Sequence, residues 1–542
     1  MPDLLLGPIL RHVDETSATV WVQTDQPCTV EVLGCAERTW CVAGHNYALV
    51  LVTGLPPGGS TPYEVRLDGD RVWPLDGSRF PPSRIRTLGP GRTLRLLFGS
   101  CRYASPDGAV AGGRFGVDAL DAYAERMARA PGDSWPDALL LLGDQVYADE
   151  TSPGTEARIR RRRDVSRSPG TQVANFEEYT TLYQESWADP HVRWLLANLP
   201  TSMIFDDHDV HDDWNTSAAW RDEMRRTGWW SERIIGGLMS YWIYQHLGNL
   251  HPDALATDDL YRRVRSAADG EPLLREFAVA ADREADGAKG AQWSYRRDFG
   301  RVRLLVIDSR CGRILIEGGR SMVSKPEFDW IESQAGGDYD HLLIGTSLPW
   351  LLPRAVHDIE SWDEVLCRPD RRRWVRRFGE WLRRYADLEH WAAFRESFDR
   401  LGAMLARVGR GGYGHRPPAT VAVLSGDVHH AYVAEARYPQ PVDSRIYQLV
   451  CSPIHQGVPA SMRLGFRVGW SRPAELLPRW LARLAGVPPV PLAWSRTAGP
   501  FFGNQLATLA VDGRHSHLLV ERAVQPGGRD AGMVPIVDVD LS

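Results

Sequence analysis

Lysine is almost absent from this chain of 542 residues, in which Lys289 and Lys325 are the only two lysines. Lysine and arginine together number 63 against 69 aspartates and glutamates, which gives a formal net charge of −6. Proteins that bind nucleic acid usually carry a basic surface. The mild acidity therefore argues against stable nucleic-acid binding, and the arginine bias by itself indicates no function.

Long hydrophobic runs are also missing. No apolar stretch approaches the roughly 18 residues that would indicate a membrane-spanning helix. The amino terminus, MPDLLLGPILRHVDE, lacks a basic region and a small-residue cleavage site. We therefore expect no transmembrane segment and a cytoplasmic location for the chain as given; a secreted or cell-surface location would follow if the chain is processed.

The seven cysteines are scattered and show no CxxC spacing. This odd number and irregular placement exclude a disulfide scaffold and a zinc ribbon. A single cysteine can still act as a metal ligand, and Cys101, at the end of an apolar run, is a candidate for that role.

The length predicts a large domain with a smaller one, because a single core rarely organises so many residues. Residues 4–88 consist of short segments with period-2 alternation, separated by glycine, proline and aspartate. This pattern predicts an N-terminal β-sandwich of the fibronectin or immunoglobulin type in residues 1–90. Residues 91–542 would form the second domain, with helical inserts near 150–300 and 457–500.

From residue 94 onward the hydrophobic pattern changes from alternation to short, continuously apolar runs. Such runs are typical of strands buried on both faces of a sheet that helices cover, which predicts an α/β fold. Each run ends in small or polar residues, and ligands of α/β sheets bind beyond the carboxyl ends of the strands. The runs are LRLLFGSC, ALLLLGDQ, SMIFDDHD, RLLVIDSR, HLLIGTSL, VAVLSGDV and YQLVCSP.

Five of these strand ends carry residues with ligand chemistry. A thiol, a phenol, imidazoles and carboxylates together suit a ferric or zinc-like ion beside a hard divalent cation better than one structural zinc. A pair of metals can hold both the attacking and the leaving oxygen of a displacement at phosphorus. The residues are Cys101 and Arg102; Asp144, Tyr147 and Asp149; the crowded turn Asp206–Asp213; Thr346 and Ser347; and Asp427, His429 and His430.

The order of the motifs GSC, GDxxY, DDHD and SGDVH resembles the PhoD-type branch of the calcineurin-like metallophosphoesterases, relatives of the purple acid phosphatases. The resemblance extends from about residue 4 to about residue 525. It implies a four-layer metallophosphoesterase-type β-sheet sandwich flanked by helices and preceded by the small β-sandwich. It also implies an alkaline phosphatase of the D type that uses Fe³⁺ and Ca²⁺, with Mn²⁺, Mg²⁺ or Zn²⁺ as alternatives for the second metal.

Carried over residue by residue, the resemblance implies that Asp144 bridges the two metals. Tyr147 would ligate the ferric ion as phenolate, and Cys101 would stand where most relatives use the first Asp of a DxH motif. Asp207 would match the Asn of the usual GNHE/D motif, and His208 would donate a hydrogen bond to the phosphoryl oxygen and the leaving group.

In the last motif, Asp427 would replace the first His of GHxH at the second metal, and His429 would keep the second His as a ligand of the first. Carboxylates at Asp207 and Asp427 make the second site harder, which favours calcium. The usual lone His ligand has no clear counterpart in GTSLPW, where Thr346 and Ser347 stand. Arg102 is a candidate phosphate contact; the alternative is an ion pair with Asp149 or a similar carboxylate.

The sequence leaves the roles of several residues open: Asp206, Asp209, His211, Asp212, Asp213 and Ser347. The four aspartates among them, Asp206, Asp209, Asp212 and Asp213, are expected to orient ligands. The inserts 217–250 and 457–500 are expected to shape the substrate entrance, and the arginine runs 158–168 and 368–384 are most often solvated helix faces.

We therefore expect a metal-dependent phosphoesterase that hydrolyses monoesters, diesters or both by attack of metal-bound hydroxide on phosphorus. Its substrates would be small-molecule, lipid-type or nucleotide-type phosphoesters. One rival is a catalytically silent metal- or phosphoryl-sensing protein with a blocked cleft. Another is a carbohydrate- or surface-binding protein led by the β-sandwich, and a serine hydrolase is disfavoured because no GxSxG elbow follows any strand.

Overall fold

The computed structural model describes residues 1–104, 115–288, 290–525 and 531–542. Its N-terminal region consists of two four-stranded antiparallel sheets, in the orders β1-β2-β6-β5 and β4-β3-β8-β9, and of the pair β10-β7. The strands are β1 (Leu4–Val13), β2 (Ser17–Thr24), β3 (Thr29–Val32), β4 (Cys35–Arg38), β5 (Trp40–Val42), β6 (His45–Thr53), β7 (Ser60–Pro62), β8 (Val65–Leu67), β9 (Asp70–Trp73) and β10 (Arg84–Arg86).

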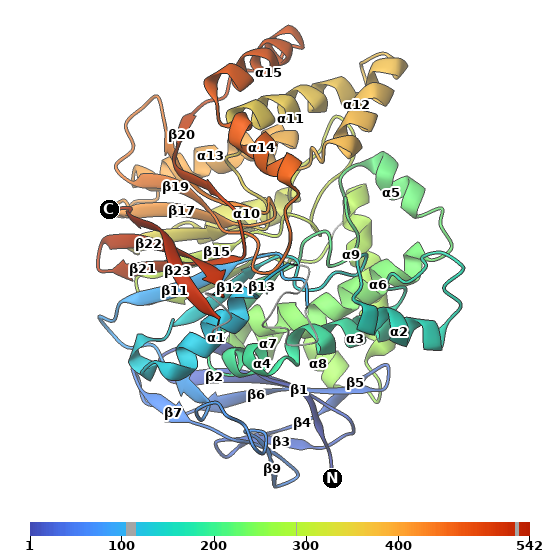
Figure 1. The fold of residues 1–542 in the computed structure, drawn as a ribbon, viewed down its shortest axis with the longest axis vertical. Helices are drawn as coiled ribbons and strands as arrows, with labels where there is room; N and C mark the ends of the chain where they lie inside the picture. The colour runs from blue at the N-terminus through green and yellow to red at the C-terminus, as the bar shows by residue number, and fades with distance from the viewer. Residues whose placement is uncertain (105–114, 289, 526–530) are drawn as a thin grey trace.

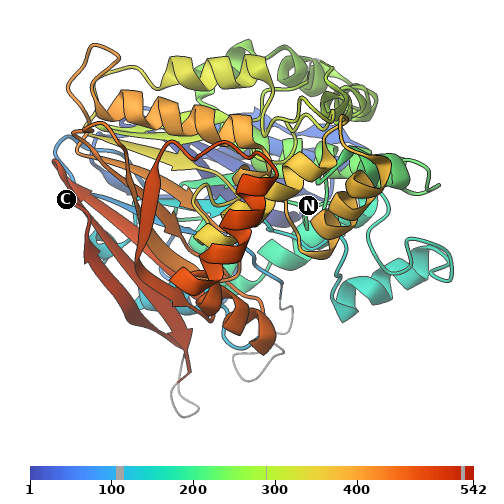
Figure 2. The same cartoon turned by 90° about the horizontal axis from the view of Figure 1, so that it is seen from above.

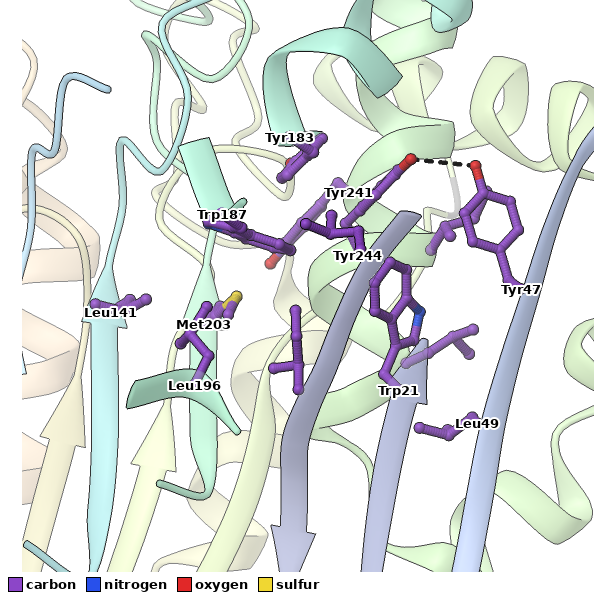
Figure 3. Packing of buried hydrophobic residues seen from close by; sticks show 14 of the residues in the cluster. Trp21, Tyr47, Leu49, Leu141, Tyr183, Trp187, Leu196, Met203, Tyr241 and Tyr244 are labelled. Atoms are coloured by element: carbon purple, nitrogen blue, oxygen red, sulfur yellow. Dashed lines mark hydrogen bonds between the residues drawn. The ribbon is translucent and has the colours of Figure 1, made fainter. Parts of the chain in front are cut away.

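The N-terminal region packs against helices that come much later in the chain. Trp21 and Tyr47 lie beside Tyr183, Trp187 and Tyr244, and the hydroxyls of Tyr47 and Tyr244 are 3.2 Å apart (Figure 3). Buried aromatic side chains contribute large apolar areas to such interfaces. The β-sandwich is therefore joined to the rest of the protein by a shared core.

The remainder of the chain is built on two larger sheets. A six-stranded sheet has the order β13-β12-β11-β21-β22-β23, and a seven-stranded sheet has the order β14-β15-β16-β17-β19-β18-β20. The strands are β11 (Leu94–Gly99), β12 (Ala138–Leu142), β13 (Thr201–Ile204), β14 (Tyr295–Phe299), β15 (Val302–Val306), β16 (His341–Gly345), β17 (Thr420–Ser425), β18 (Ala431–Arg437), β19 (Arg445–Val450), β20 (Ala493–Phe501), β21 (Gln505–Asp512), β22 (His515–Val524) and β23 (Gly532–Asp540).

Alternation along the strands assigns each side chain to one layer of the core. Leu140 in β12 packs with Leu343 in β16 and Leu424 in β17, between the two sheets. Their neighbours Leu141 and Leu342 point to the outer faces, where helices cover them. Because successive side chains of a strand alternate between faces, both faces of each strand must be apolar. The predicted four-layer architecture is confirmed.

The helices cover the outer faces of the two sheets and form a separate group at the top of Figure 1, where α11, α12, α14 and α15 lie. No helix among the described residues is both long and apolar enough to span a membrane. The helices are α1 (Ala119–Arg129), α2 (Pro153–Arg162), α3 (Phe176–Trp187), α4 (Pro190–Leu196), α5 (Ala218–Met224), α6 (Trp230–Ser240), α7 (Pro252–Thr257), α8 (Asp259–Ser266), α9 (Glu271–Asp282), α10 (Lys325–Gln334), α11 (Arg354–Cys367), α12 (Arg373–Tyr385), α13 (Arg395–Gly409), α14 (Ala460–Gly469) and α15 (Arg472–Leu484).

Candidate metal centre

The carboxyl ends of strands from both sheets meet at one place. β11, β12 and β13 are parallel, and so are β15, β16, β17 and β19. The loop after β17 is joined to the loop after β11, since the Asp427 amide donates to Ser100 Oγ at 3.0 Å. The loop after β11 is joined in turn to the loop after β12, where the Cys101 amide donates to the Gly143 carbonyl at 3.2 Å.

Ligand atoms of Cys101, Asp144 and His429 lie within 4.8 Å of one another. We call these three residues the mixed-donor group. Tyr147 is close by, with its ring centroid 4.8 Å from that of His208. The Tyr147 hydroxyl and both carboxylate oxygens of Asp144 are buried and have no hydrogen-bond partner among the described residues.

A second set of ligand atoms, those of Asp144, Asp206, Asp207 and Asp427, also lies within 4.8 Å. We call it the carboxylate group, and it shares Asp144 with the mixed-donor group. Burial, together with the charges of Asp206 and Asp207, raises the pKa of Asp144 well above its usual range, although His208 opposes the shift. Burial likewise raises the pKa of Asp207 to about 6. A bound cation would offset the cost of ionising carboxylates packed this closely.

The donors present fit metal ions. Buried polar oxygens without partners are costly, and a cation supplies the missing interaction. Burial lowers the pKa of His429 to about 4, which keeps its imidazole neutral and able to coordinate. The two groups share one carboxylate, which is the arrangement that a pair of neighbouring ions requires.

Four ligand-type residues occupy a strained backbone region. Cys101, Asp144, Asp427 and His429 have φ values of 58°, 49°, 64° and 51°. Such left-handed conformations cost residues with a side chain roughly 1–3 kcal/mol each and collect at functional sites. These four residues lie in the loops after β11, β12 and β17, and their ligand atoms gather in the mixed-donor and carboxylate groups.

Asp209 holds the loop that carries Asp144. Its carboxylate accepts hydrogen bonds from the amides of Asp144, Gln145 and Val146 at 3.0, 3.0 and 3.1 Å, and from the Asp206 amide at 2.9 Å. Burial raises its pKa to about 7, against the lowering effect of these bonds. One of the roles that the sequence left open is thereby visible, because Asp209 ties the loop after β12 to the loop after β13.

His208 lies next to both groups and is oriented by Asp149. Its Nδ1 is 3.0 Å from Asp149 Oδ2. Burial alone would lower the pKa of His208, but the charges of Asp149 and Asp207 outweigh it and raise the pKa well above 6.5. The imidazole therefore keeps its proton more readily than a free histidine does.

Arg102 does not face these groups in the way that the sequence suggested. It is 3% exposed, its Nε lies 2.7 Å from Asp118 Oδ2, and its Nη1 donates to the Ser186 carbonyl at 2.7 Å. The structure favours the ion-pair alternative over a phosphate contact, with Asp118 rather than Asp149 as the carboxylate. Two of its donor atoms, Nε and Nη1, are engaged by these protein partners.

Two cations beside the carboxylate group were missed in the sequence. Arg310, fully buried after β15, contacts Asp206 and Glu389, and its Nη2 lies 3.1 Å from Asp207 Oδ1. His390 Nε2 lies 3.1 Å from Asp427 Oδ2. Arg310 ends the run RLLVIDSR, so its position at a strand end was a usable signal; His390 follows a helix and offered none.

The remaining candidates lie outside both groups. Ser347 Oγ is 2.8 Å from Ser309 Oγ, and Thr346 Oγ1 donates to the same hydroxyl at 3.1 Å. The Asp213 amide donates to Asp207 Oδ2 at 3.2 Å, and the Asp212 amide to Asp149 Oδ2 at 2.6 Å. His211 Nδ1 is 2.7 Å from the Asp212 carbonyl. These residues support the loops around the centre.

Comparison with known proteins agrees with this arrangement. The fold is of the metallophosphoesterase type, and residues 108–268 match the model of the PhoD-like phosphatase family. The matched residues include the motifs GDxxY and DDHD, so the resemblance to the PhoD-like phosphatases is confirmed for this part of the chain. Residues 1–85 match a domain of unknown function (DUF7800).

Among solved structures, one described as the structure of PhoD is similar with a TM-score of 0.57 and 12% identity, over 98% of this chain and 89% of that chain. Purple acid phosphatase PPD1 from seeds of yellow lupin (Lupinus luteus) is similar with a TM-score of 0.47 and 12% identity, over 97% of this chain and 74% of that chain. No curated protein matches the chain.

Proposed function

We propose that this protein is a binuclear metal-dependent phosphoesterase of the PhoD-like type, acting on phosphate monoesters, diesters or both. The observation that carries the proposal is that two sets of potential ligands share Asp144. A phosphatase-family match over residues 108–268, which include Asp144, supports the same activity. The proposed substrates are small-molecule, lipid-type or nucleotide-type phosphoesters.

The first metal would be held by Cys101, Tyr147, His429 and Asp144. A thiolate and a phenolate are ligands that favour a ferric ion. Both groups are protonated before metal binds, because burial and neighbouring carboxylates raise the pKa of Cys101 and of Tyr147 well above their usual ranges. Binding would displace both protons.

The second metal would be held by Asp144, Asp207 and Asp427. An all-oxygen set of carboxylates is typical of calcium sites, with Mn²⁺, Mg²⁺ and Zn²⁺ as alternatives. Asp206 joins this set in the structure, although its Oδ1 is already committed to Arg310. We assign Asp206 the role of orienting the neighbouring Asp207, whose amide donates to it at 3.1 Å.

The chain's own contribution to the reaction centres on His208. When bound, the metal pair supplies a nucleophile at neutral pH and polarises the phosphoryl oxygens. Asp149 accepts the Nδ1 proton and raises the pKa of His208, which favours the form that carries a second proton at Nε2; that Nε2 proton can be donated to the leaving oxygen. Its imidazole is part-buried, with 23% of the side chain exposed, so a substrate can reach it.

The test is hydrolysis of p-nitrophenyl phosphate and bis-p-nitrophenyl phosphate by the metal-stripped protein, before and after reloading with iron and calcium. We expect turnover only after reloading. Metal uptake without turnover of either ester would contradict the proposal and support the silent, metal-sensing rival. The ratio of the two rates decides between monoesterase and diesterase.

His208→Ala tests the proposed donor. We expect full metal content and a loss of turnover of about a hundredfold or more, the range for removal of a general acid. His517→Ala, at a histidine of β22 whose side chain is 43% exposed, is the matched control and should leave turnover unchanged. Loss of metal from His208→Ala would show that the residue is a ligand instead.

The division into a β-sandwich at 1–90 and a catalytic domain at 91–542 is part of the same proposal. The linker between them, residues 87–93, carries Thr87, whose hydroxyl donates to the Pro56 carbonyl at 2.6 Å. Because the two parts share a core, separate expression of either part should expose Trp21, Tyr47 and their partners. Cellular location stays a prediction from the sequence.

A further inference from the structure

Helix α12 carries a row of exposed aromatic side chains. Trp374, Phe378, Trp381 and Tyr385 are 68%, 43%, 55% and 77% exposed. Their spacing of four, three and four residues places them on one face of the helix. The opposite face is packed on α11, where a Cβ on Gly379 would lie 2.8 Å from Cys367 Sγ. The aromatic row is therefore turned outward by the way the helix is anchored.

Helix α15 carries a second apolar row. Leu476, Leu477, Trp480 and Leu484 are 68%, 62%, 55% and 66% exposed, while Pro478 and Ala482 are buried on the other side. Leu464 and Val468 of α14 add two more exposed apolar side chains. Exposed apolar residues that stand singly need no explanation, but contiguous rows of them mark an interaction surface.

The two rows lie at the same end of the molecule. α12 and α15 are both at the top of Figure 1, and both pack on α11, so they belong to one group of helices, which Figure 2 shows from that end. A hydrogen bond of 2.9 Å from Arg371 Nη2 to the Ala485 carbonyl joins the start of α12 to the end of α15. We call the outward faces of α12, α14 and α15 the helical cap.

The helical cap is basic on a protein that is acidic overall. Between residues 368 and 385, all described, Asp370 is the one exposed acidic residue, whereas five arginines are exposed. Between residues 463 and 484, all described, the one acidic residue is Glu475, which pairs with Arg479. The exposed arginines are Arg368, Arg372, Arg373, Arg376 and Arg377, with Arg463, Arg467, Arg472 and Arg483 on the other two helices.

We infer that the helical cap docks on a membrane surface that carries anionic lipids. Helices with tryptophan, phenylalanine and leucine on one face and arginine along its edge lie in the plane of the membrane interface. The arginines would meet lipid phosphates while the aromatic and leucine side chains enter the acyl boundary. A second copy of this chain fits the cap less well, because a two-fold contact would set one arginine-rich surface against another.

The test is flotation of the metal-loaded protein with phosphatidylcholine vesicles, with and without phosphatidylglycerol, at low and high salt. We expect binding to the anionic vesicles that is at least about tenfold tighter than to neutral ones, and that weakens with salt. Trp381→Ser combined with Trp480→Ser should weaken binding at least about tenfold, because two large side chains lose their burial. Arg373→Gln and Arg377→Gln should each cost about fivefold on anionic vesicles.

The matched control is Leu51→Ser combined with Leu75→Ser, two leucines of the N-terminal region that are 42% and 41% exposed. These changes should leave vesicle binding unchanged, and thermal unfolding checks that all variants are folded. Equal binding of wild type and the Trp variant, or equal binding to neutral vesicles, would overturn the inference. So would a dimer, seen by light scattering, that the Trp variant dissociates. No readout involves hydrolysis, so the outcome is independent of the proposed function.

Discussion

The mixed-donor group and the carboxylate group share Asp144, yet their surroundings differ in charge. Beside the carboxylate group stand Arg310, a permanent cation, and His390, whose pKa is raised by Glu360 and Asp427 against the effect of burial. The partners of Cys101 in the mixed-donor group are hydroxyls, since Ser100 Oγ and Ser452 Oγ each lie 3.2 Å from its sulfur. Protein cations therefore offset part of the charge of the carboxylate group. In the mixed-donor group, the Cys101 thiol stays uncharged because its pKa is raised.

This difference separates the metal chemistry of the two groups. In the carboxylate group, Arg310 offsets part of the charge of Asp206 and Asp207 without metal. The mixed-donor group gains its charge only when a metal replaces the protons of Cys101 and Tyr147. Four changes would break or sharpen the comparison.

Asp144→Asn removes the carboxylate that both groups share and should have the largest effect. We expect turnover of aryl phosphates to fall below about a thousandth of wild type, because several kcal/mol of transition-state stabilisation depend on the metals. The measurement is the steady-state rate at saturating iron and calcium. Turnover within tenfold of wild type would show that Asp144 does not join the two groups.

Arg310→Gln leaves Asp206 and Asp207 without their buried cation, while Glu389 keeps its pair with Arg313. We expect the free energy of unfolding to fall by about 3–5 kcal/mol, the usual cost of removing one partner of a buried ion pair. Urea unfolding measures it, and added calcium should restore part of the loss because the folded state binds the ion. Arg71→Gln, which removes an exposed pair with Asp76, is the control and should cost less than about 1 kcal/mol.

The pH dependence of metal binding should differ between the groups. Cys101 and Tyr147 are neutral at pH 7 because their pKa values are raised, so metal binding to the mixed-donor group releases two protons. Iron affinity should therefore rise up to about a hundredfold per pH unit. Calcium affinity should fall near and below pH 6, where Asp207 titrates, and the raised pKa of Asp144 adds a proton that either ion must displace, so the calcium slope should be the smaller one. Equal slopes for both ions in binding titrations would contradict the distinction.

His390→Gln should have the smallest effect of the four. His390 lies between Glu360, with Nδ1 at 2.7 Å, and Asp427, with Nε2 at 3.1 Å, so it orients a ligand without joining the set. Removing a partner of this kind usually lowers metal affinity about 10-fold to 100-fold. We expect weaker calcium binding and unchanged iron binding. An equal loss of iron binding would contradict the assignment of His390 to the carboxylate group alone.

The fold and the ligand-type residues could be predicted because both depend on local patterns. Apolar runs such as ALLLLGDQ place polar residues at strand ends, and parallel strands bring those ends together. Cys101, Asp144, Asp207, Asp427 and His429 all follow that pattern, and the structure gathers them.

The residues that compensate charge could not be predicted in the same way. His390 comes from a loop after α12, far in sequence from Asp427 and outside any strand-end pattern. The contacts of Arg102 depend on Asp118, 16 residues away at the start of α1, which no spacing rule indicates. Both pairings depend on tertiary packing.

The most direct test of a binuclear centre is elemental analysis of wild type and Asp144→Asn after reloading with iron and calcium. The shared carboxylate predicts two ions per chain in wild type and a loss of both ions in the variant. One ion per chain in wild type, or a variant in which either group keeps its full occupancy, would contradict a centre built around Asp144.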